Sequence, residues 1–152
     1  MHDIPEGFVE ADLGGGFVGH NGPVYERILP DGGGAQLGIR IAAHHANPAG
    51  MVHGGMMATL MDVGIAYNAA HVAGDGTFFV TMGLSLNFLS AAGMGDWVAT
   101  RARVSRRGGK TLFGTGEIWC GDRLLMTGSG IYTPWKGKAQ PTEGYADFKQ
   151  PG

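Results

Sequence analysis

The sequence predicts an α+β fold in which a strongly curved antiparallel β-sheet wraps around one long central helix. The central segment, residues 54–73, has the length and end signals of a helix, and it is apolar almost throughout. Strand-like segments precede and follow it, and glycine-rich turns separate them. A helix that is apolar on all sides has to be buried on all sides. We therefore expect the sheet to cover most of the helix and a second subunit to cover the rest.

The first predicted elements are a pair of strands. Residues 24–29 (VYERIL) and 35–42 (AQLGIRIA) have strand character, and the Asp-Gly-Gly-Gly sequence at 31–34 supplies a turn between them. Glycine is the outlier of the composition, with 29 in 152 residues, against a usual share of about 7%. Many of these glycines fall in short clusters, which favours turns between strands.

The central helix is predicted to begin at about Gly54 and to end at about Ala73, because Gly74 is a suitable helix stop. Turn residues bound each of the strands predicted after it. In the second of these, apolar side chains alternate with arginines, which indicates one packed and one solvated sheet face and thus antiparallel pairing. The four strands are 77–90, 96–107, 110–120 and 123–134.

A chain of 152 residues is long enough for one domain with a proper core. We expect an N-terminal extension at 1–20 and the folded domain at 21–134. Residues 135–152 contain prolines among residues of mixed polarity, which is typical of a loosely attached tail.

The charge and the cysteine content narrow the class of protein. A formal net charge of −2 gives no field that would bind nucleic acid. No apolar run reaches the roughly 18 residues of a membrane span, and the N-terminus lacks the pattern of a signal peptide. Cys120 is the single cysteine and has no partner for an internal disulfide. We therefore expect a cytoplasmic protein that binds neither nucleic acid nor membrane.

Asp62 is the unusual residue of the central helix. A carboxylate in an apolar setting is costly unless it is paired or hydrogen-bonded, so it needs either a function or a local backbone partner. His53-Gly54-Gly55 begins the same helix, and the unpaired N–H groups of a helix start can bind a developing oxyanion. The glycines leave room for a substrate carbonyl, although a tight loop-to-helix turn would explain them as well.

Helical geometry separates these two features. Gly54 and Asp62 are eight residues apart, which corresponds to about 12 Å along one helix. One carbonyl cannot contact both. If two helices pair antiparallel about a two-fold axis, the N-terminus of one approaches Asp62 of the other. We expect a homodimer with active sites shared between its subunits.

The segment from Asn47 to Asp62, NPAGMVHGGMMATLMD, resembles the active-site signature of hotdog-fold acyl-CoA thioesterases, specifically the PaaI-like (phenylacetic acid degradation) branch. The order of loop, helix, glycine turn and four strands extends the resemblance over residues 22–134. The resemblance implies the hotdog fold and hydrolysis of a thioester to a free carboxylic acid and coenzyme A. It also implies a homodimer or a dimer of dimers.

The resemblance also implies roles for individual residues. Asp62 matches the catalytic acid, acting as general base toward water or as nucleophile. Gly54 and Gly55 match the helix-start glycines whose amides polarise the thioester carbonyl.

Three further positions match the family pattern. His53 is the signature histidine, although a structural loop histidine would look the same. Asn47 matches an asparagine that holds the carbonyl or the attacking water. Thr81 falls where the family often has a small hydroxyl residue near the acid, and its alternative is an ordinary strand threonine.

Thioester hydrolysis needs an oriented water and an oxyanion site, because the sulfur is a good leaving group. We therefore expect no cofactor, since coenzyme A is part of the substrate. We also expect no metal, because His44, His45 and His53 lack a zinc-binding spacing.

The phosphates of coenzyme A need a local cationic site. A basic Gly-Gly hairpin between the second and third of the later strands is our candidate, and a solvated hairpin without a ligand is the alternative. The candidate residues are Arg106, Arg107, Gly108 and Lys110.

Two other functions remain open. His45 followed by a helix acid is loosely similar to hydroxyacyl dehydratases and hydratases, although the D-x-x-x-x-H pattern of one such group is absent. A non-catalytic acyl-CoA-binding or regulatory module is the second, although no helix-turn-helix or basic arm accompanies it.

Overall fold

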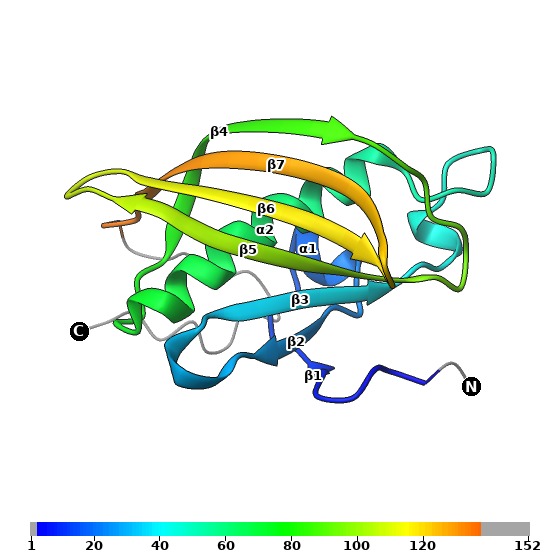
Figure 1. The fold of residues 1–152 in the computed structure, drawn as a ribbon, viewed down its shortest axis with the longest axis horizontal. Coiled ribbons are helices and arrows are strands. Elements are labelled where there is room, and N and C mark those ends of the chain that lie inside the picture. The colour runs from blue at the N-terminus through cyan, green and yellow to red at the C-terminus, as the bar shows by residue number, and fades with distance from the viewer. Residues whose placement is uncertain (1–2, 138–152) are drawn as a thin grey trace.

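The computed structural model describes residues 3–137, which form one antiparallel sheet curved around a long helix (Figure 1). Seven strands make up the sheet in the order β1-β2-β3-β5-β6-β7-β4. Their bounds are Val9–Glu10 for β1, Tyr25–Ile28 for β2, Ala35–Arg40 for β3, Phe79–Phe88 for β4, Trp97–Arg107 for β5, Leu112–Cys120 for β6 and Arg123–Pro134 for β7. The α+β prediction and the six strands expected from the sequence are confirmed.

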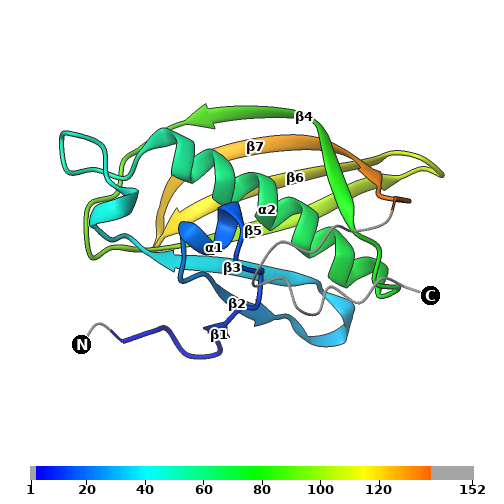
Figure 2. The same ribbon diagram turned by 180° about the vertical axis from the view of Figure 1, so that it is seen from behind.

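The central helix, α2, spans Gly54–Ala73 and lies across the concave face of the sheet (Figure 2). His53 is its N-cap, with an extended backbone (φ −67°, ψ 137°) and a side chain that accepts from the N–H of Gly55. Gly74 ends the helix in the left-handed region (φ 67°), a conformation that costs glycine little. The other helical segments within residues 3–137 are α1 (Phe17–His20) and two 3-10 turns (Pro30–Gly32 and Ala43–His45).

Small residues allow the helix and the sheet to approach closely. A Cβ added to Gly64 of α2 would lie 2.7 Å from Thr100 Cγ2 on β5, and one added to Gly116 of β6 would lie 2.6 Å from Met61 Sδ. These distances are shorter than carbon and sulfur atoms tolerate. Glycines inside the helix and inside the strands therefore allow helix and sheet to pack closely, in addition to the turn glycines expected from the sequence.

Polar groups inside this interface are hydrogen-bonded. Asn68 of α2 is buried, and its Oδ1 accepts from the main-chain N–H of Ala35 at 3.2 Å. The buried Thr100 Oγ1 accepts from the N–H of Leu37 at 2.9 Å. Both contacts fix β3 beneath the helix without leaving a buried polar group unpaired.

The predicted N-terminal extension contributes to the sheet, because β1 pairs with β2 through Val9↔Glu26 and Glu10↔Tyr25. The domain limits remain a prediction, and residues 138–152 of the predicted tail lie outside the described residues. Within residues 3–137, no helix combines the length and apolarity needed to cross a membrane.

Candidate active site

Asp62 lies half-buried in the middle of α2, where strands β4 and β7 pass beneath the helix. Thr81 Oγ1, on β4, donates to Asp62 Oδ1 at 2.8 Å. The hydroxyl of Tyr132, on β7, lies 3.1 Å from the same oxygen and 3.1 Å from the main-chain oxygen of Asp62. Thr81 and Tyr132 are register partners, so two neighbouring strands present their hydroxyls side by side to one carboxylate.

The strand geometry changes at this point. The β4–β7 register shifts between Thr81 and Gly83, which marks a β-bulge immediately after the threonine. Bulges bend a strand and redirect its side chains, and they are common beside active sites.

Tyr132 is the site residue that sequence reasoning missed. It is fully buried, and its pKa is raised by burial first, then by the charge of Asp62 and the hydrogen bond to it. It therefore remains a neutral donor at ordinary pH. The available signal was its position: Tyr132 falls on the packed face of β7, in alternation with Gly128 and Gly130, and is the large polar side chain on that face.

The start of α2 presents one free main-chain donor. The Gly55 N–H is taken by His53 Nδ1 at 2.8 Å, and the Met56 N–H by the His53 carbonyl at 2.9 Å. Within the described part of the chain, no group accepts from the N–H of Gly54. Of the two glycine amides expected to polarise a carbonyl, Gly54 is thus the one available to a ligand, and Gly55 is engaged within the chain.

His53 and Asn47 both shape the loop that leads into α2. Because His53 Nδ1 accepts a hydrogen bond, the ring proton of the neutral side chain belongs on Nε2. Asn47 Oδ1 accepts from the N–H groups of Ala49 and Met51, at 2.9 and 3.2 Å. The loop therefore uses the side-chain carbonyl of Asn47. Within residues 3–137 no group accepts from its NH₂, which can donate to a ligand.

His45 lies beneath this loop and is buried. Its Nδ1 accepts from the Ala42 N–H at 3.0 Å and its Nε2 donates to the Asn21 carbonyl at 2.7 Å. Burial lowers its pKa, more than the hydrogen bond to Asn21 raises it, and the neighbouring His44 adds to the lowering. Among residues 3–137, no three His, Cys, Asp or Glu side chains are grouped closely enough to hold a metal ion.

The chain brings Asp62 and Thr81 together, but not Asp62 and the helix start. Gly54 and Asp62 belong to the same unbroken helix, and eight residues of helix span about 12 Å.

The basic hairpin lies at the C-terminal end of α2, away from Gly54 (Figure 2). Arg107 is tied there to Asp75 by an ion pair of 3.2 Å. Hydrogen bonds lower the pKa of Asp75 to about 2. The largest effect comes from the Thr77 hydroxyl, followed by the Thr77 main-chain N–H and then by Arg107. Arg106, Gly108 and Lys110 are exposed on the same hairpin.

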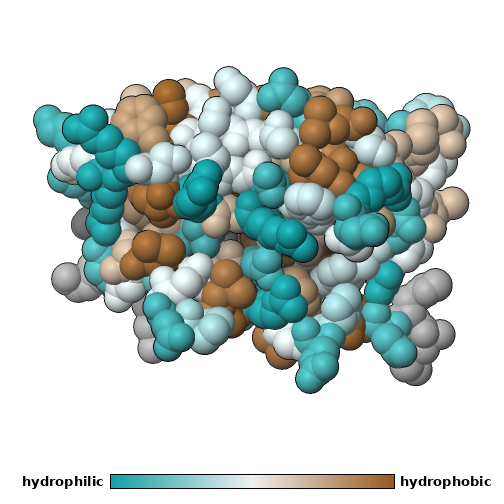
Figure 3. Space-filling view, viewed as in Figure 1, coloured by the Kyte–Doolittle hydropathy of each residue, from teal (hydrophilic) through white to brown (hydrophobic). Residues whose placement is uncertain are grey.

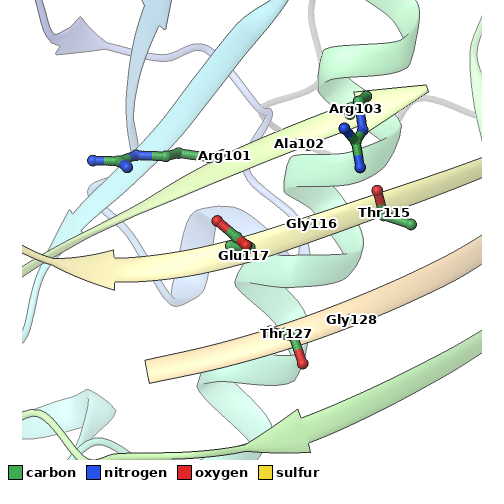
Figure 4. A pocket seen from close by; sticks show the side chains of 8 residues that line it. All are labelled: Arg101, Ala102, Arg103, Thr115, Gly116, Glu117, Thr127 and Gly128. Atoms are coloured by element: carbon green, nitrogen blue, oxygen red, sulfur yellow. The ribbon is translucent and has the colours of Figure 1, made fainter. Parts of the chain in front are cut away.

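A polar hollow of about 430 Å³ lies on the outer face of the sheet, where polar side chains gather (Figures 3 and 4). Gly116 and Gly128 line it with their backbone, because a Cβ at either position would point toward Met61 on the helix side. The hollow is separated from Asp62 by the sheet. Its lining residues are Arg101, Ala102, Arg103, Thr115, Gly116, Glu117, Thr127 and Gly128.

Known proteins resemble this chain in sequence and in fold. The Thioesterase superfamily model matches residues 49–127. PA0474 of Pseudomonas aeruginosa, whose name describes it as an esterase, is 33% identical over 134 residues. These residues cover 87% of this chain and 98% of that protein.

Two solved structures extend the comparison. A phenylacetic acid degradation-related protein from Ralstonia eutropha JMP134 is 26% identical, with a TM-score of 0.68 over 76% of this chain and 88% of that one. The BH2602 protein from Bacillus halodurans, solved with CoA, is 25% identical, with a TM-score of 0.60 over 66% of each chain. With a hotdog fold, a family match over more than half of its length and these relatives, the chain belongs to the Thioesterase superfamily, as a PaaI-like hotdog thioesterase.

Proposed function

We propose that this thioesterase hydrolyses an acyl-CoA to a free carboxylic acid and coenzyme A, with Asp62 as the catalytic carboxylate. The observation that carries the proposal is the setting of Asp62, a half-buried acid on an apolar helix, held by hydroxyl donors from two strands. The structure of the related BH2602 protein contains CoA, which supports this choice of thiol.

The site is completed by a second copy of the chain. Strand β4 hydrogen-bonds to β7 on one side, and within the described residues no strand covers its other edge. Met82, Phe88 and Leu89, in or next to β4, are 64%, 58% and 56% exposed. A long uncovered edge with apolar side chains is a template for pairing with another strand, and a two-fold axis makes that pairing β4 to β4.

This pairing accounts for the position of the acid. Thr81 belongs to β4 and holds Asp62, so the carboxylate lies close to the edge where the second subunit arrives. Antiparallel packing of the two α2 helices then brings Gly54 of the partner subunit close to Asp62. The two residues can therefore contact the same substrate. A homodimer has two such sites, and a dimer of dimers would have four.

The reaction follows from these groups. The Gly54 N–H donates to the thioester carbonyl oxygen and stabilises the negative charge that develops on it. Asp62 either takes a proton from the water that attacks the carbonyl carbon, or attacks that carbon itself and forms an anhydride that water opens. The C–S bond breaks, the thiolate of coenzyme A leaves and takes up a proton, and the carboxylic acid remains. The NH₂ of Asn47 donates to the carbonyl or to the water.

The basic hairpin binds the phosphates of coenzyme A in this proposal. The end of α2 at Ala73 lies eleven residues beyond Asp62, or about 16 Å along the helix. The extended pantetheine arm of coenzyme A spans a separation of this order. Within residues 3–137, Arg106 and Lys110 of the hairpin are exposed and form no ion pair with another side chain. The N–H of Gly108 donates to the Thr111 carbonyl at 2.7 Å and closes the turn. Arg107 would have to share its guanidinium with Asp75.

The test is the release of free thiol from a panel of acyl-CoAs. We expect Asp62→Asn and Asp62→Ala to lower kcat by about a hundredfold or more, because both lack the base or nucleophile. Asp122→Asn, at the exposed turn between β6 and β7, is the matched control and should keep native activity. Full turnover in Asp62→Ala would end the proposed mechanism. Hydration of an enoyl-CoA without thiol release would support a hydratase, and binding without either reaction would support the non-catalytic module.

A further inference from the structure

We propose that Tyr132 is a positioning residue for Asp62: together with Thr81 it holds Oδ1 of the carboxylate and leaves Oδ2 as the oxygen that reacts. The inference rests on the proposed function for its catalytic consequence, and on the contacts of three described side chains for its geometry. Tyr132 does not touch the substrate in this account and acts only through Asp62.

The two hydroxyls saturate one carboxylate oxygen. Thr81 Oγ1 lies 2.8 Å and the Tyr132 hydroxyl 3.1 Å from Asp62 Oδ1. Each hydroxyl has one proton to donate, and a carboxylate oxygen has two lone-pair positions. Among residues 3–137, no group hydrogen-bonds to Asp62 Oδ2. The unbonded oxygen is therefore the one that can take a proton from water or attack a carbonyl carbon.

The Tyr132 hydroxyl has a choice of acceptors. The main-chain oxygen of Asp62 is also 3.1 Å away, but a bond to an ionised carboxylate is about twice as strong as one to a neutral carbonyl. The charged form of Asp62 therefore draws the proton of Tyr132 toward Oδ1. The side chain is locked in this arrangement while it is ionised, which is the form that both proposed mechanisms require.

The backbone of β7 makes room for the tyrosine ring. A Cβ added to Gly130 would lie 2.4 Å from Tyr132 Cε2 and 2.5 Å from its hydroxyl. The ring thus lies back over Gly130, and a side chain at this position would push the hydroxyl away. Both donors are also carried by paired strands, since Thr81 and Tyr132 are register partners. Groups on rigid, packed elements hold a catalytic side chain more accurately than loops do.

The central comparison is Tyr132→Phe with Tyr67→Phe. Tyr67 is a partly buried tyrosine of α2 whose hydroxyl donates to the carboxylate of Glu26, so its replacement removes the same atom from another tyrosine–carboxylate pair. We expect Tyr132→Phe to lower kcat by about tenfold to a hundredfold with KM changed by less than about twofold, because only the orientation of the reacting group is lost. Tyr67→Phe should keep the native kcat. Gly130→Ala should reproduce the loss of kcat while the hydroxyl is still present.

A double-mutant cycle separates positioning from general destabilisation. In the Asp62→Asn background, Tyr132→Phe should cause no further loss of the residual rate, because the group it positions is gone. A crystal structure of Tyr132→Phe should show the Asp62 side chain in a different rotamer or in several. An unchanged kcat together with an unmoved Asp62 would overturn the proposal, as would additive losses in the cycle. If the native chain releases no thiol from any acyl-CoA, the proposed function fails, and the crystal structure alone decides whether Tyr132 holds Asp62.

Discussion

Thr81 supplies one of the two hydroxyl donors to Asp62. We predict that Thr81→Val, which keeps the shape of the side chain and removes the donor, lowers kcat by about tenfold. A hydrogen bond to a charged group contributes about 1.5–3 kcal/mol, and about 1.4 kcal/mol of transition-state stabilisation is tenfold in rate. Thr77→Val is the matched control for kcat, because Thr77 donates to Asp75 in the same manner away from the reacting carboxylate. Equal rates for Thr81→Val and the native chain would remove Thr81 from the account.

The lowered pKa of the buried His45 predicts that the free energy of unfolding depends on pH. Burial holds its pKa below the ordinary 6.5, so below pH 6.5 the unfolded chain binds a proton that the folded chain does not. This contribution to stability is fully present above pH 6.5 and is lost as the pH falls toward the folded-state pKa. Urea unfolding between pH 8 and pH 5 should show the decline, and His45→Gln should show a weaker one. An equal decline in both chains would contradict the assignment.

At the scale of single elements, the contact between α2 and β5 predicts that alanine is harmful at Gly64. Alanine favours a helix by about 1 kcal/mol over glycine, but its Cβ would meet Thr100 Cγ2 at 2.7 Å. We expect Gly64→Ala to lower the free energy of unfolding by about 1–3 kcal/mol, the usual cost of overpacking. Gly109→Ala, with no atom within 4 Å of the new Cβ, should change it little. A Gly64→Ala chain as stable as the native one would show that the interface can relax.

The long elements could be predicted because their ends carry local signals. The predicted limits of α2 agree with the structure, since His53 caps one end and Gly74 the other, and turn residues likewise delimit the later strands. The two-residue strand β1 was missed because its exposed Val9 and Glu10 have no periodic pattern. The order of the strands in the sheet could not be predicted from the sequence either, because the place of β4 beside β7 depends on how the sheet curves around the helix.

The candidate site likewise has residues with a local signal in the sequence and residues that only the fold brings together. Asp62 stood out because a lone acid interrupts an apolar helix, and a family resemblance pointed to Thr81. Tyr132 lies 70 residues away from Asp62 in the chain, and the curvature of the sheet makes them neighbours. The occupation of the Gly55 amide by His53 depends on the rotamer of the cap, which a sequence pattern does not specify.

At the scale of the whole molecule, the two sheet edges predict different effects on assembly. Met82, on the β4 edge, and Val9, on the β1 edge, are 64% and 61% exposed. We expect Met82→Asp to shift the protein toward monomer and to lower its activity in parallel, because a charge opposes burial of the β4 edge. Val9→Asp should stay dimeric and active. Sedimentation velocity with activity measured at the same concentrations checks this, and an active Met82→Asp monomer would contradict the shared site.

We propose that each active site combines Asp62 of one subunit with Gly54 of the other. Gly54→Pro removes the free N–H at the first helical position, where proline is well tolerated, and the extended backbone of His53 suits a residue before proline. Gly54→Ala is its matched control, because it adds a Cβ near Phe88 and keeps the N–H.

The most direct measurement mixes Asp62→Asn and Gly54→Pro chains, each inactive alone, by co-expression or by refolding together. In a hybrid dimer with shared sites, one site carries both substitutions and the other carries neither. Since random mixing makes about half of the dimers hybrid, we predict that thiol release returns to about a quarter of the native rate. If each site lies within one chain, both sites of the hybrid are defective, and a mixture as inactive as its two components would contradict the account.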